Sequence, residues 1–261
     1  MSKKFVLSID QGTTSSRSIL FTEKAEIRAV ASEPLECRYP DSGWVEQDAE
    51  AIWETQRSTI VKVLDQAGIG LSEVSAIGIT NQRESTIAWN RETGEALCPA
   101  INWQCRRTAG VCDELKEEGF DELIRNRTGL VTDPYFSGTK MHWILQNVHE
   151  AANLARQGKL CFGTVDSWLI WKLSGGTTHA IEISNASRTL VFDIQKCEWD
   201  SEILARFGIP PESLPEVVPS SGVIAEVDES LFGGSAPIAG AAGDQQAALF
   251  GQACFTPGMA K

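Results

Sequence analysis

The residues best suited to chemistry stand near the start of the sequence, in the segment Asp10-Gln11-Gly12-Thr13-Thr14-Ser15-Ser16-Arg17. Gly12 permits a tight backbone bend close to a ligand, and an arginine is a fixed fork of donors that matches phosphate oxygens. The pattern predicts a site for a metal-bound nucleotide phosphate, with Asp10 facing Mg²⁺. The phosphate would be held by Thr13, Thr14, Ser15 and Arg17. An ordinary β-hairpin with a polar turn uses the same residue types.

A second polar group follows a predicted strand at residues 76–80. Asn81-Gln82-Arg83-Glu84 comes directly after it, and α/β proteins place ligand-facing loops at such strand ends. Arg83 can donate to the adjacent hydroxyls of a polyol, and Glu84 can accept from them. A surface ion pair at a strand end explains these two residues equally well.

Two aromatic residues in predicted loops would suit a small sugar-like ligand. Trp103 and Tyr135 lie next to polar residues. An aromatic face together with a phenolic hydroxyl can contact the C–H side and one hydroxyl of such a ligand. Core packing is the commoner role of a single tryptophan, and this chain has eight.

A third polar group is Ala242-Gly243-Asp244-Gln245-Gln246-Ala247, which begins a predicted helix. A carboxylate that opens a helix lies at the positive end of the helix dipole, where negative charge is favoured. A simple N-cap aspartate has the same appearance. If Asp10 and Asp244 face one cleft, the pair is interpreted as a metal holder and a general base.

Length, charge and composition exclude several classes of protein. The 261 residues, of which 42% are hydrophobic, allow one large domain or two modest ones. The net charge of −12 argues against nucleic acid or an anionic membrane as a partner, because both need a basic surface. No apolar run reaches the ~18 residues of a membrane span. No P-loop motif occurs, and because no G-x-G-x-x-G follows a strand, a dinucleotide oxidoreductase is disfavoured.

The seven cysteines give an expectation about location. Their number is odd, and no C-x-x-C motif occurs among them. Reduced thiols in a cytoplasmic protein explain this pattern most simply.

The elements that position these residues follow from hydrophobic periodicity and turn residues. Strands predicted at 5–9, 17–21 and 27–32, a helix capped by Asp48 that runs to residue 67, and the strand at 76–80 give the order β-β-β-α-β. Further strands are expected at 86–89, 181–183 and 188–194. Further helices are expected at 107–118, 138–156, 165–173, 201–207 and 243–251.

Assembled, these segments resemble the amino-terminal half of the glycerol kinases in the FGGY family of carbohydrate kinases. The similarity runs from Phe5 to Lys261. The segments that carry it are residues 10–17, 40–48, 78–84, 103–108, 135–147, 163–169 and 242–246. The resemblance implies an α/β fold of the actin-like ATPase or ribonuclease-H-like type, with a mixed sheet flanked by helices.

The resemblance also implies roles for the residues. Glycerol would be contacted by Arg83, Glu84, Trp103, Tyr135, Asp244 and Gln245, with Asp244 as the catalytic base. The implied reaction is the ATP-dependent phosphorylation of glycerol to sn-glycerol 3-phosphate. ATP would be the co-substrate and Mg²⁺ the cofactor, with Asp10 near the metal. The full-length protein is expected to be a homo-oligomer.

The domain expectation follows from the same resemblance. Residues 1–252 would form the substrate-binding domain, and residues 253–261 would begin the connection to a second lobe that closes over the nucleotide. We expect the single lobe to be inactive or nearly so, because it cannot exclude water from the reaction. Relatives inhibited by fructose bisphosphate carry an arginine beside the glycines of the loop at 231–236, and this sequence has none there.

Three alternatives stay open. Another FGGY kinase, such as a pentulose kinase, would share the fold, although Arg83, Glu84 and Trp103 favour glycerol. A non-catalytic actin-like module would bind nucleotide or a partner and would have no need of the polyol residues. A nuclease of the ribonuclease-H type would need clustered carboxylates on two metals and a basic surface.

Overall fold

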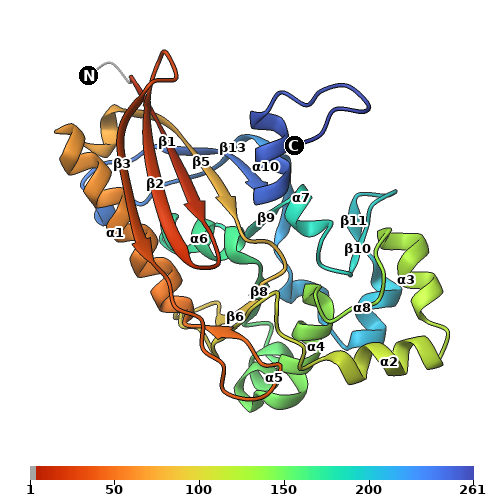
Figure 1. Ribbon diagram of the computed structural model, residues 1–261. Helices are drawn as coiled ribbons and strands as arrows, with labels where there is room; N and C mark the ends of the chain where they lie inside the picture. Colours follow the sequence, from red (N-terminus) through yellow and green to blue (C-terminus); the bar gives the residue numbers. More distant parts are fainter. Residues whose placement is uncertain (1–3) are drawn as a thin grey trace.

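A six-stranded mixed sheet is the centre of the computed structural model, which describes residues 4–261 (Figure 1). The strands are β1 (Phe5–Gln11), β2 (Ser15–Thr22), β3 (Ile27–Pro34), β5 (Val74–Asn81), β13 (Ser221–Glu226) and β14 (Pro237–Gly243). Their order across the sheet is β13-β14-β5-β1-β2-β3. The strands β1, β5 and β14 run parallel to one another, whereas β2, β3 and β13 each pair antiparallel with a neighbour.

One face of the sheet is buried under two helices, α1 (Ala49–Ala67) and α6 (Val165–Leu173). Alternate residues of a strand point to opposite faces, so Leu7, Ile9 and Ile77 pack against these helices in one core. The Asp48 side chain accepts hydrogen bonds from the backbone N–H groups of Glu50 and Ala51 at the start of α1. Gly68 ends the helix in a left-handed conformation with a φ of 70°.

Most of the chain between β5 and β13, apart from α6, forms a second layer beside the carboxyl ends of β1 and β5 (Figure 1). Its core includes Phe136, Met141, Phe162 and Phe207. The helices of this layer are α2 (Ala109–Glu117), α3 (Asp121–Thr128), α4 (Ser137–Asn147), α5 (His149–Arg156), α7 (Ile183–Ala186) and α8 (Ser201–Phe207). Its strands are β6 (Ile87–Asn90), β7 (Ala100–Ile101), β8 (Leu160–Gly163), β9 (Ala180–Glu182), β10 (Phe192–Asp193), β11 (Glu198–Trp199) and β12 (Glu216–Val218).

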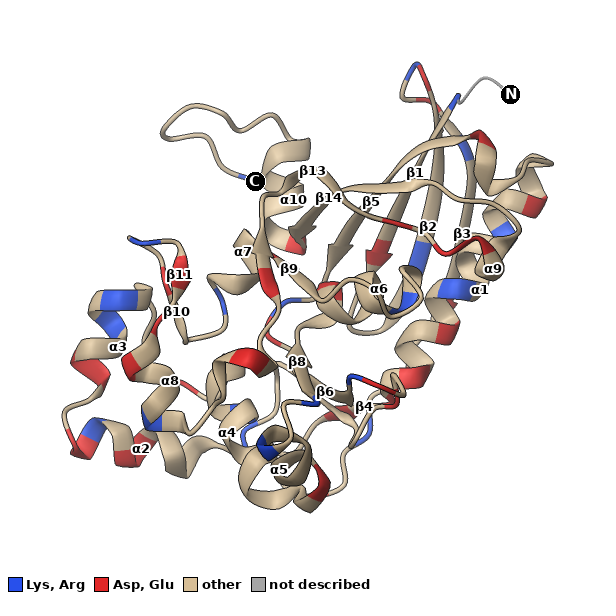
Figure 2. Cartoon of the chain, turned by 180° about the vertical axis from the view of Figure 1, so that it is seen from behind, with Lys and Arg blue, Asp and Glu red and all other residues tan. Residues whose placement is uncertain are grey.

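Two α-helices and one β-strand lie outside these two groups, and the short 3₁₀ helices are η1 (Leu71–Glu73) and η2 (Pro211–Ser213). The strand β4 (Glu46–Gln47) pairs with β7, the short helix α9 (Glu229–Phe232) precedes β14, and α10 (Asp244–Gly251) follows it. Acidic and basic residues are mixed over both the sheet and the helical layer (Figure 2). Within residues 4–261, each helix is too short or too polar to cross a membrane.

The structure confirms the β-β-β-α-β order and the helices at 165–173 and 201–207. The single helix predicted at 138–156 is wrong, because Val148 takes an extended conformation (φ −107°, ψ 98°) and separates α4 from α5. Most of the strand predicted at 188–194 is also wrong. Leu190 has a φ of 70°, which a strand does not accommodate, and only β10 remains.

Candidate active site

Three parallel strands end side by side and bring the predicted site residues together. Gln11 at the end of β1 pairs with Asn81 of β5, and Asn81 pairs with Gly243 of β14. The turn after β1, the loop after β5 and the first residue of α10 therefore meet at one edge of the sheet. Ligands of α/β proteins bind at such carboxyl strand ends.

A cavity of about 120 Å³ lies between these segments. Its lining consists of Thr13, Gln82, Arg83, Glu84, Trp103, Tyr135, Asp244 and Gln245. All six residues predicted to contact glycerol are among them. The cavity is well below the ~300–1,000 Å³ of pockets for drug-sized ligands, and it suits a ligand of a few heavy atoms.

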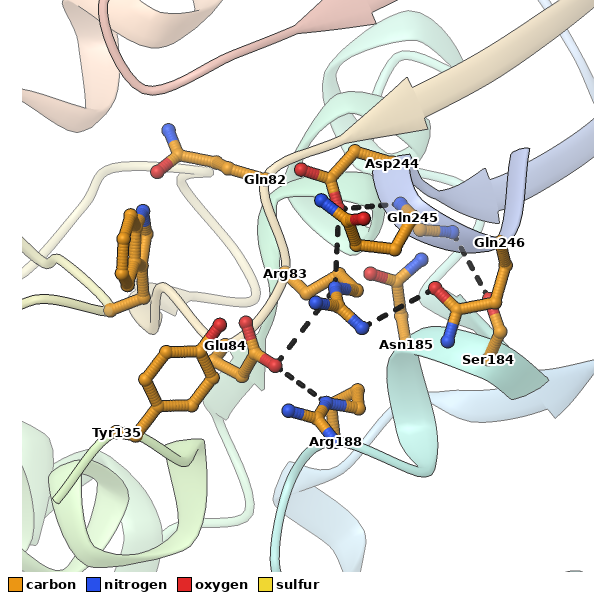
Figure 3. Close-up of polar contacts among 12 residues, drawn as sticks. Gln82, Arg83, Glu84, Tyr135, Ser184, Asn185, Arg188, Asp244, Gln245 and Gln246 are labelled. Atoms are coloured by element: carbon orange, nitrogen blue, oxygen red, sulfur yellow. Dashed lines mark hydrogen bonds and ion pairs between the residues drawn. The ribbon is translucent and has the colours of Figure 1, made fainter. Parts of the chain in front are cut away.

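The Arg83 guanidinium lies between two carboxylates at this cavity (Figure 3). Its Nε is 3.2 Å from Asp244 Oδ1 and 3.9 Å from Glu84 Oε1. Burial raises the pKa of the Glu84 carboxyl, although the nearby positive charges, Arg188 above all, oppose that rise. The Nε of Arg188 donates to Glu84 Oε1 at 2.6 Å. The cavity thus presents a cation and two carboxylates to a ligand that both donates and accepts hydrogen bonds.

Trp103 and Tyr135 form an aromatic wall of the cavity. Their ring centroids are 5.5 Å apart, with an angle of 61° between the planes. The Nε1 of Trp103 donates to Thr13 Oγ1 at 2.9 Å, so the indole is held at a defined angle. Apolar C–H groups of a ligand can pack on this wall while its hydroxyls face the charged side.

Glu84 is held in an unusual backbone conformation, with a φ of 48°. Such a conformation costs about 1–3 kcal/mol and persists where the surroundings enforce it. Here the carbonyl oxygen of Glu84 accepts hydrogen bonds from Ser137 Oγ at 3.1 Å and from Lys140 Nζ at 3.0 Å. The fully buried Lys140 also donates to the carbonyl of Tyr135 at 2.6 Å, and burial lowers the pKa of this amine to about 7. One amine therefore ties together two loops of the cavity.

A network of buried amides joins the turn after β1 to the cavity. Gln47 Nε2 donates to the carbonyl of Thr13 at 2.8 Å, and Gln82 Nε2 donates to Gln47 Oε1 at 3.0 Å. Asn102 Nδ2 donates to the same Gln47 oxygen at 2.9 Å. Because a satisfied buried network holds its members rigidly, the turn and the cavity keep fixed relative positions.

The residues predicted for phosphate and metal lie beside the cavity, in the turn between β1 and β2 and in the strand ends that flank it. Thr14 and Arg17 are exposed, and Arg17 Nη1 is 3.8 Å from Asp10 Oδ2. Burial raises the pKa of the Asp10 carboxyl, Arg17 opposes this, and the negative charge of Asp244 adds to it. The carboxylates of Asp10 and Asp244 are therefore close enough to interact electrostatically. Thr13 differs from Thr14 and Arg17, because it is one of the residues that line the cavity.

The side chains around the turn after β1 show what kind of metal site could form there. Within residues 4–261, no cluster of three or more His, Cys, Asp or Glu side chains is arranged to hold a metal ion. Mg²⁺ commonly takes only one or two carboxylates and completes its shell with water and substrate phosphates. The carboxylate of Asp10 fits that kind of site.

Comparison with known proteins agrees with this arrangement. The amino-terminal domain of the FGGY family of carbohydrate kinases matches residues 5–251. The chain belongs to this family. A glycerol kinase of Carboxydothermus hydrogenoformans is 55% identical to this FGGY chain over 262 aligned residues, which cover 100% of the chain and 52% of the relative. The chain therefore spans about half the length of the curated relatives it matches.

Solved structures show the same fold for this FGGY chain. A crystal structure of Plasmodium falciparum glycerol kinase with ADP has a TM-score of 0.90 and 32% identity, covering 97% of this chain and 51% of that one. A xylulose kinase from Rhodospirillum rubrum has a TM-score of 0.86 and 25% identity, covering 98% and 52%. These matches confirm the predicted family and the actin-like fold.

Several residues that support the site in this FGGY chain were given no role by the sequence reasoning. Gln47, Gln82 and Lys140 lie inside segments that the resemblance quoted, so their place in those segments was the available signal. Asn185 and Arg188 lie in a region where the sequence predicted short strands, and no pattern marked them.

Proposed function

We propose that this chain is the glycerol-binding lobe of an ATP-dependent kinase that converts glycerol to sn-glycerol 3-phosphate. The small cavity carries the proposal, because Arg83, Glu84 and Asp244 face an aromatic wall across a space suited to a three-carbon polyol. Identity supports glycerol over a pentulose, since it is 55% to a glycerol kinase and 25% to a xylulose kinase.

Asp244 is the proposed general base. It lies at the first turn of α10 with its carboxylate partly exposed, and Arg83 restrains one of its oxygens at 3.2 Å. In this proposal the carboxylate takes the proton of a terminal glycerol hydroxyl while that oxygen attacks the γ-phosphate of ATP in line. A positioned base contributes roughly 10²–10⁴-fold to the rate of such a step.

The turn after β1 is the proposed phosphate side. Arg17 and the hydroxyls and amides of Thr13, Thr14 and Ser15 would orient the phosphates of ATP, and Asp10 would hold Mg²⁺. When bound, Mg²⁺ neutralises charge on the phosphate oxygens. Residues 1–252 would be the substrate-binding domain, and residues 253–261 would lead to a second lobe that covers the nucleotide. Assembly into a homo-oligomer and a cytoplasmic location stay predictions.

Calorimetric titration of this chain with glycerol, and separately with xylulose, tests the proposal. We expect glycerol to bind and xylulose to bind at least about tenfold more weakly, a difference of ~1.4 kcal/mol. Tighter binding of xylulose would favour the pentulose kinase alternative. Binding of ATP with no binding of either polyol would favour a non-catalytic actin-like module.

A further inference from the structure

A four-residue helix, α7, is hydrogen-bonded to both strand ends that carry the charged residues of the cavity. Ser184 Oγ accepts the backbone N–H of Gly243 at 3.0 Å. The Asn185 side chain exchanges two hydrogen bonds with the Asn81 side chain, at 2.9 and 3.2 Å. Gly243 directly precedes Asp244, and Asn81 begins the loop that holds Arg83 and Glu84. The helix therefore connects the two loops at their roots.

A buried carboxylate sets the direction of the Ser184 hydroxyl. Glu182 has no exposed surface and accepts from Ser184 Oγ at 2.6 Å and from the backbone N–H of Asn185 at 3.1 Å. A hydroxyl has one proton to donate and two lone pairs that accept. Because the proton of Ser184 is committed to Glu182, its lone pairs are directed toward the N–H of Gly243.

Gly243 has no room for a side chain. A Cβ at this position would lie 2.5 Å from Cδ and 2.8 Å from Cγ of Arg83. The stem of Arg83 therefore rests directly on the backbone of Gly243. A shift of Gly243 would carry Asp244 with it, whereas Arg83 only packs against Gly243, so the 3.2 Å separation of the ion pair would change.

We propose that Ser184, aimed by Glu182, is a positioning residue that sets the separation of Arg83 and Asp244 and thereby the affinity for glycerol. Ser184 does not line the cavity and acts on it through Gly243. Asn185 holds the other loop through Asn81. The inference rests on the proposed function, because glycerol is the ligand that Arg83 and Asp244 would bind.

The test uses the 261-residue chain, the variant Ser184→Ala and two readouts. Exchange of the Gly243 amide hydrogen, followed by NMR, reports the bond to Ser184. Glycerol affinity, measured by calorimetry, reports the cavity. Loss of one hydrogen bond should speed the exchange of Gly243 by about tenfold and weaken glycerol binding by about 5- to 10-fold. Ser184→Thr keeps the hydroxyl and should restore both values.

Ser187→Ala is the matched control. Its hydroxyl belongs to the end of the same helix and donates to the carbonyl of Ser184 at 2.8 Å. We expect both readouts of this variant to stay within about twofold of the wild type. An equal effect of Ser187→Ala would overturn the proposal, because any disturbance of α7 would then suffice. Unchanged exchange of Gly243 in Ser184→Ala, or faster exchange with unchanged glycerol affinity, would overturn it as well.

A third readout separates this inference from the proposed function. If the wild-type chain binds no glycerol, the proposed function fails for this chain. The Nε–H resonance of Arg83, which reports the ion pair with Asp244, then decides the positioning role. A shift of that resonance in Ser184→Ala, restored in Ser184→Thr, supports the role, and an unmoved resonance overturns it.

Discussion

The two sides of the candidate site are built differently. On the proposed polyol side, which is the cavity and the residues that support it, Glu84, Gln82 and Asn102 are buried and hydrogen-bonded to their neighbours. On the phosphate side, Thr14 and Arg17 are exposed, and the 3.8 Å from Arg17 to Asp10 is longer than a hydrogen bond. The first side is fixed before any ligand arrives, whereas the second has free donors.

This difference indicates which of the two proposed ligands, the polyol or the nucleotide, finds a finished binding site in this chain. A preorganised site binds without further ordering of its side chains, so the cavity is ordered in advance for the small ligand that we propose. Open donors on a turn become effective when a second surface closes over the phosphates and excludes water. The division agrees with relatives that are about twice as long as this chain.

The largest expected effect is the loss of turnover in Asp244→Asn, which separates binding from catalysis within the polyol side. In the enzyme completed by a second lobe, kcat should fall roughly 10²–10⁴-fold because the amide cannot accept the proton. Glycerol affinity should change far less, since the amide oxygen still faces Arg83. Steady-state kinetics together with calorimetry measure both values.

Asp228→Asn serves as the control for this variant. Asp228 caps the short helix α9 by accepting the N–H of Ser230 at 2.8 Å, and it does not line the cavity. Its kcat should equal that of the unmodified enzyme. Near-normal turnover of Asp244→Asn would remove the general-base assignment.

The second prediction compares one arginine from each side of the site. Arg83→Met should abolish measurable glycerol binding and destabilise the chain by about 1–3 kcal/mol, because the buried Glu84 carboxylate loses its 3.9 Å partner but keeps Arg188 at 2.6 Å. Arg17→Met should leave glycerol affinity within about twofold and stability within about 0.5 kcal/mol, because Arg17 is exposed. Urea unfolding and calorimetry check both variants. Equal effects of the two substitutions would contradict the contrast between the sides.

The residues that line the cavity could be predicted from the sequence, whereas the residues that support it could not. The order of strands and the groups that line the cavity followed from hydrophobic patterns and from the family resemblance, because strand ends and cavity residues lie in continuous segments. The residues that hold the cavity in shape could not be predicted in this way. Lys140 acts on carbonyl oxygens of Glu84 and Tyr135, and Ser184 acts on the amide of Gly243. Backbone groups carry no sequence signal, so a side chain that binds them gives no pattern with its partner.

The third prediction concerns the buried acid behind the polyol side. Asp166 has no exposed surface and accepts the N–H of Glu182 at 2.9 Å, and burial raises its pKa from 3.8 to about 7. A raised pKa in the folded state means that its stabilising contribution is complete below the unfolded value and is lost as the pH rises through about 7.

Asp166→Asn removes this titration. Between pH 5 and pH 8, the free energy of unfolding of the wild type should therefore fall by roughly 2–3 kcal/mol relative to the variant. Urea unfolding at several pH values measures the difference. Asp228→Asn should show no such trend, because hydrogen bonds from Ser230 lower the pKa of Asp228 and it titrates below this range. A difference between wild type and Asp166→Asn that is constant with pH would contradict the prediction.

The smallest expected effect tests how tightly the polyol side is packed. Gly243→Ala places a methyl group against the Arg83 stem and also 2.9 Å from Gln246 Oε1, so the Arg83 side chain must shift relative to Asp244. Glycerol affinity should fall by about tenfold, ~1.4 kcal/mol. Gly78→Ala on the neighbouring strand β5 is the matched control, because a Cβ there meets nothing within 4 Å. Calorimetry on the two variants compares them directly. If Gly243→Ala binds glycerol as tightly as Gly78→Ala, then Arg83 tolerates displacement, and the polyol side is less rigid than its buried hydrogen bonds indicate.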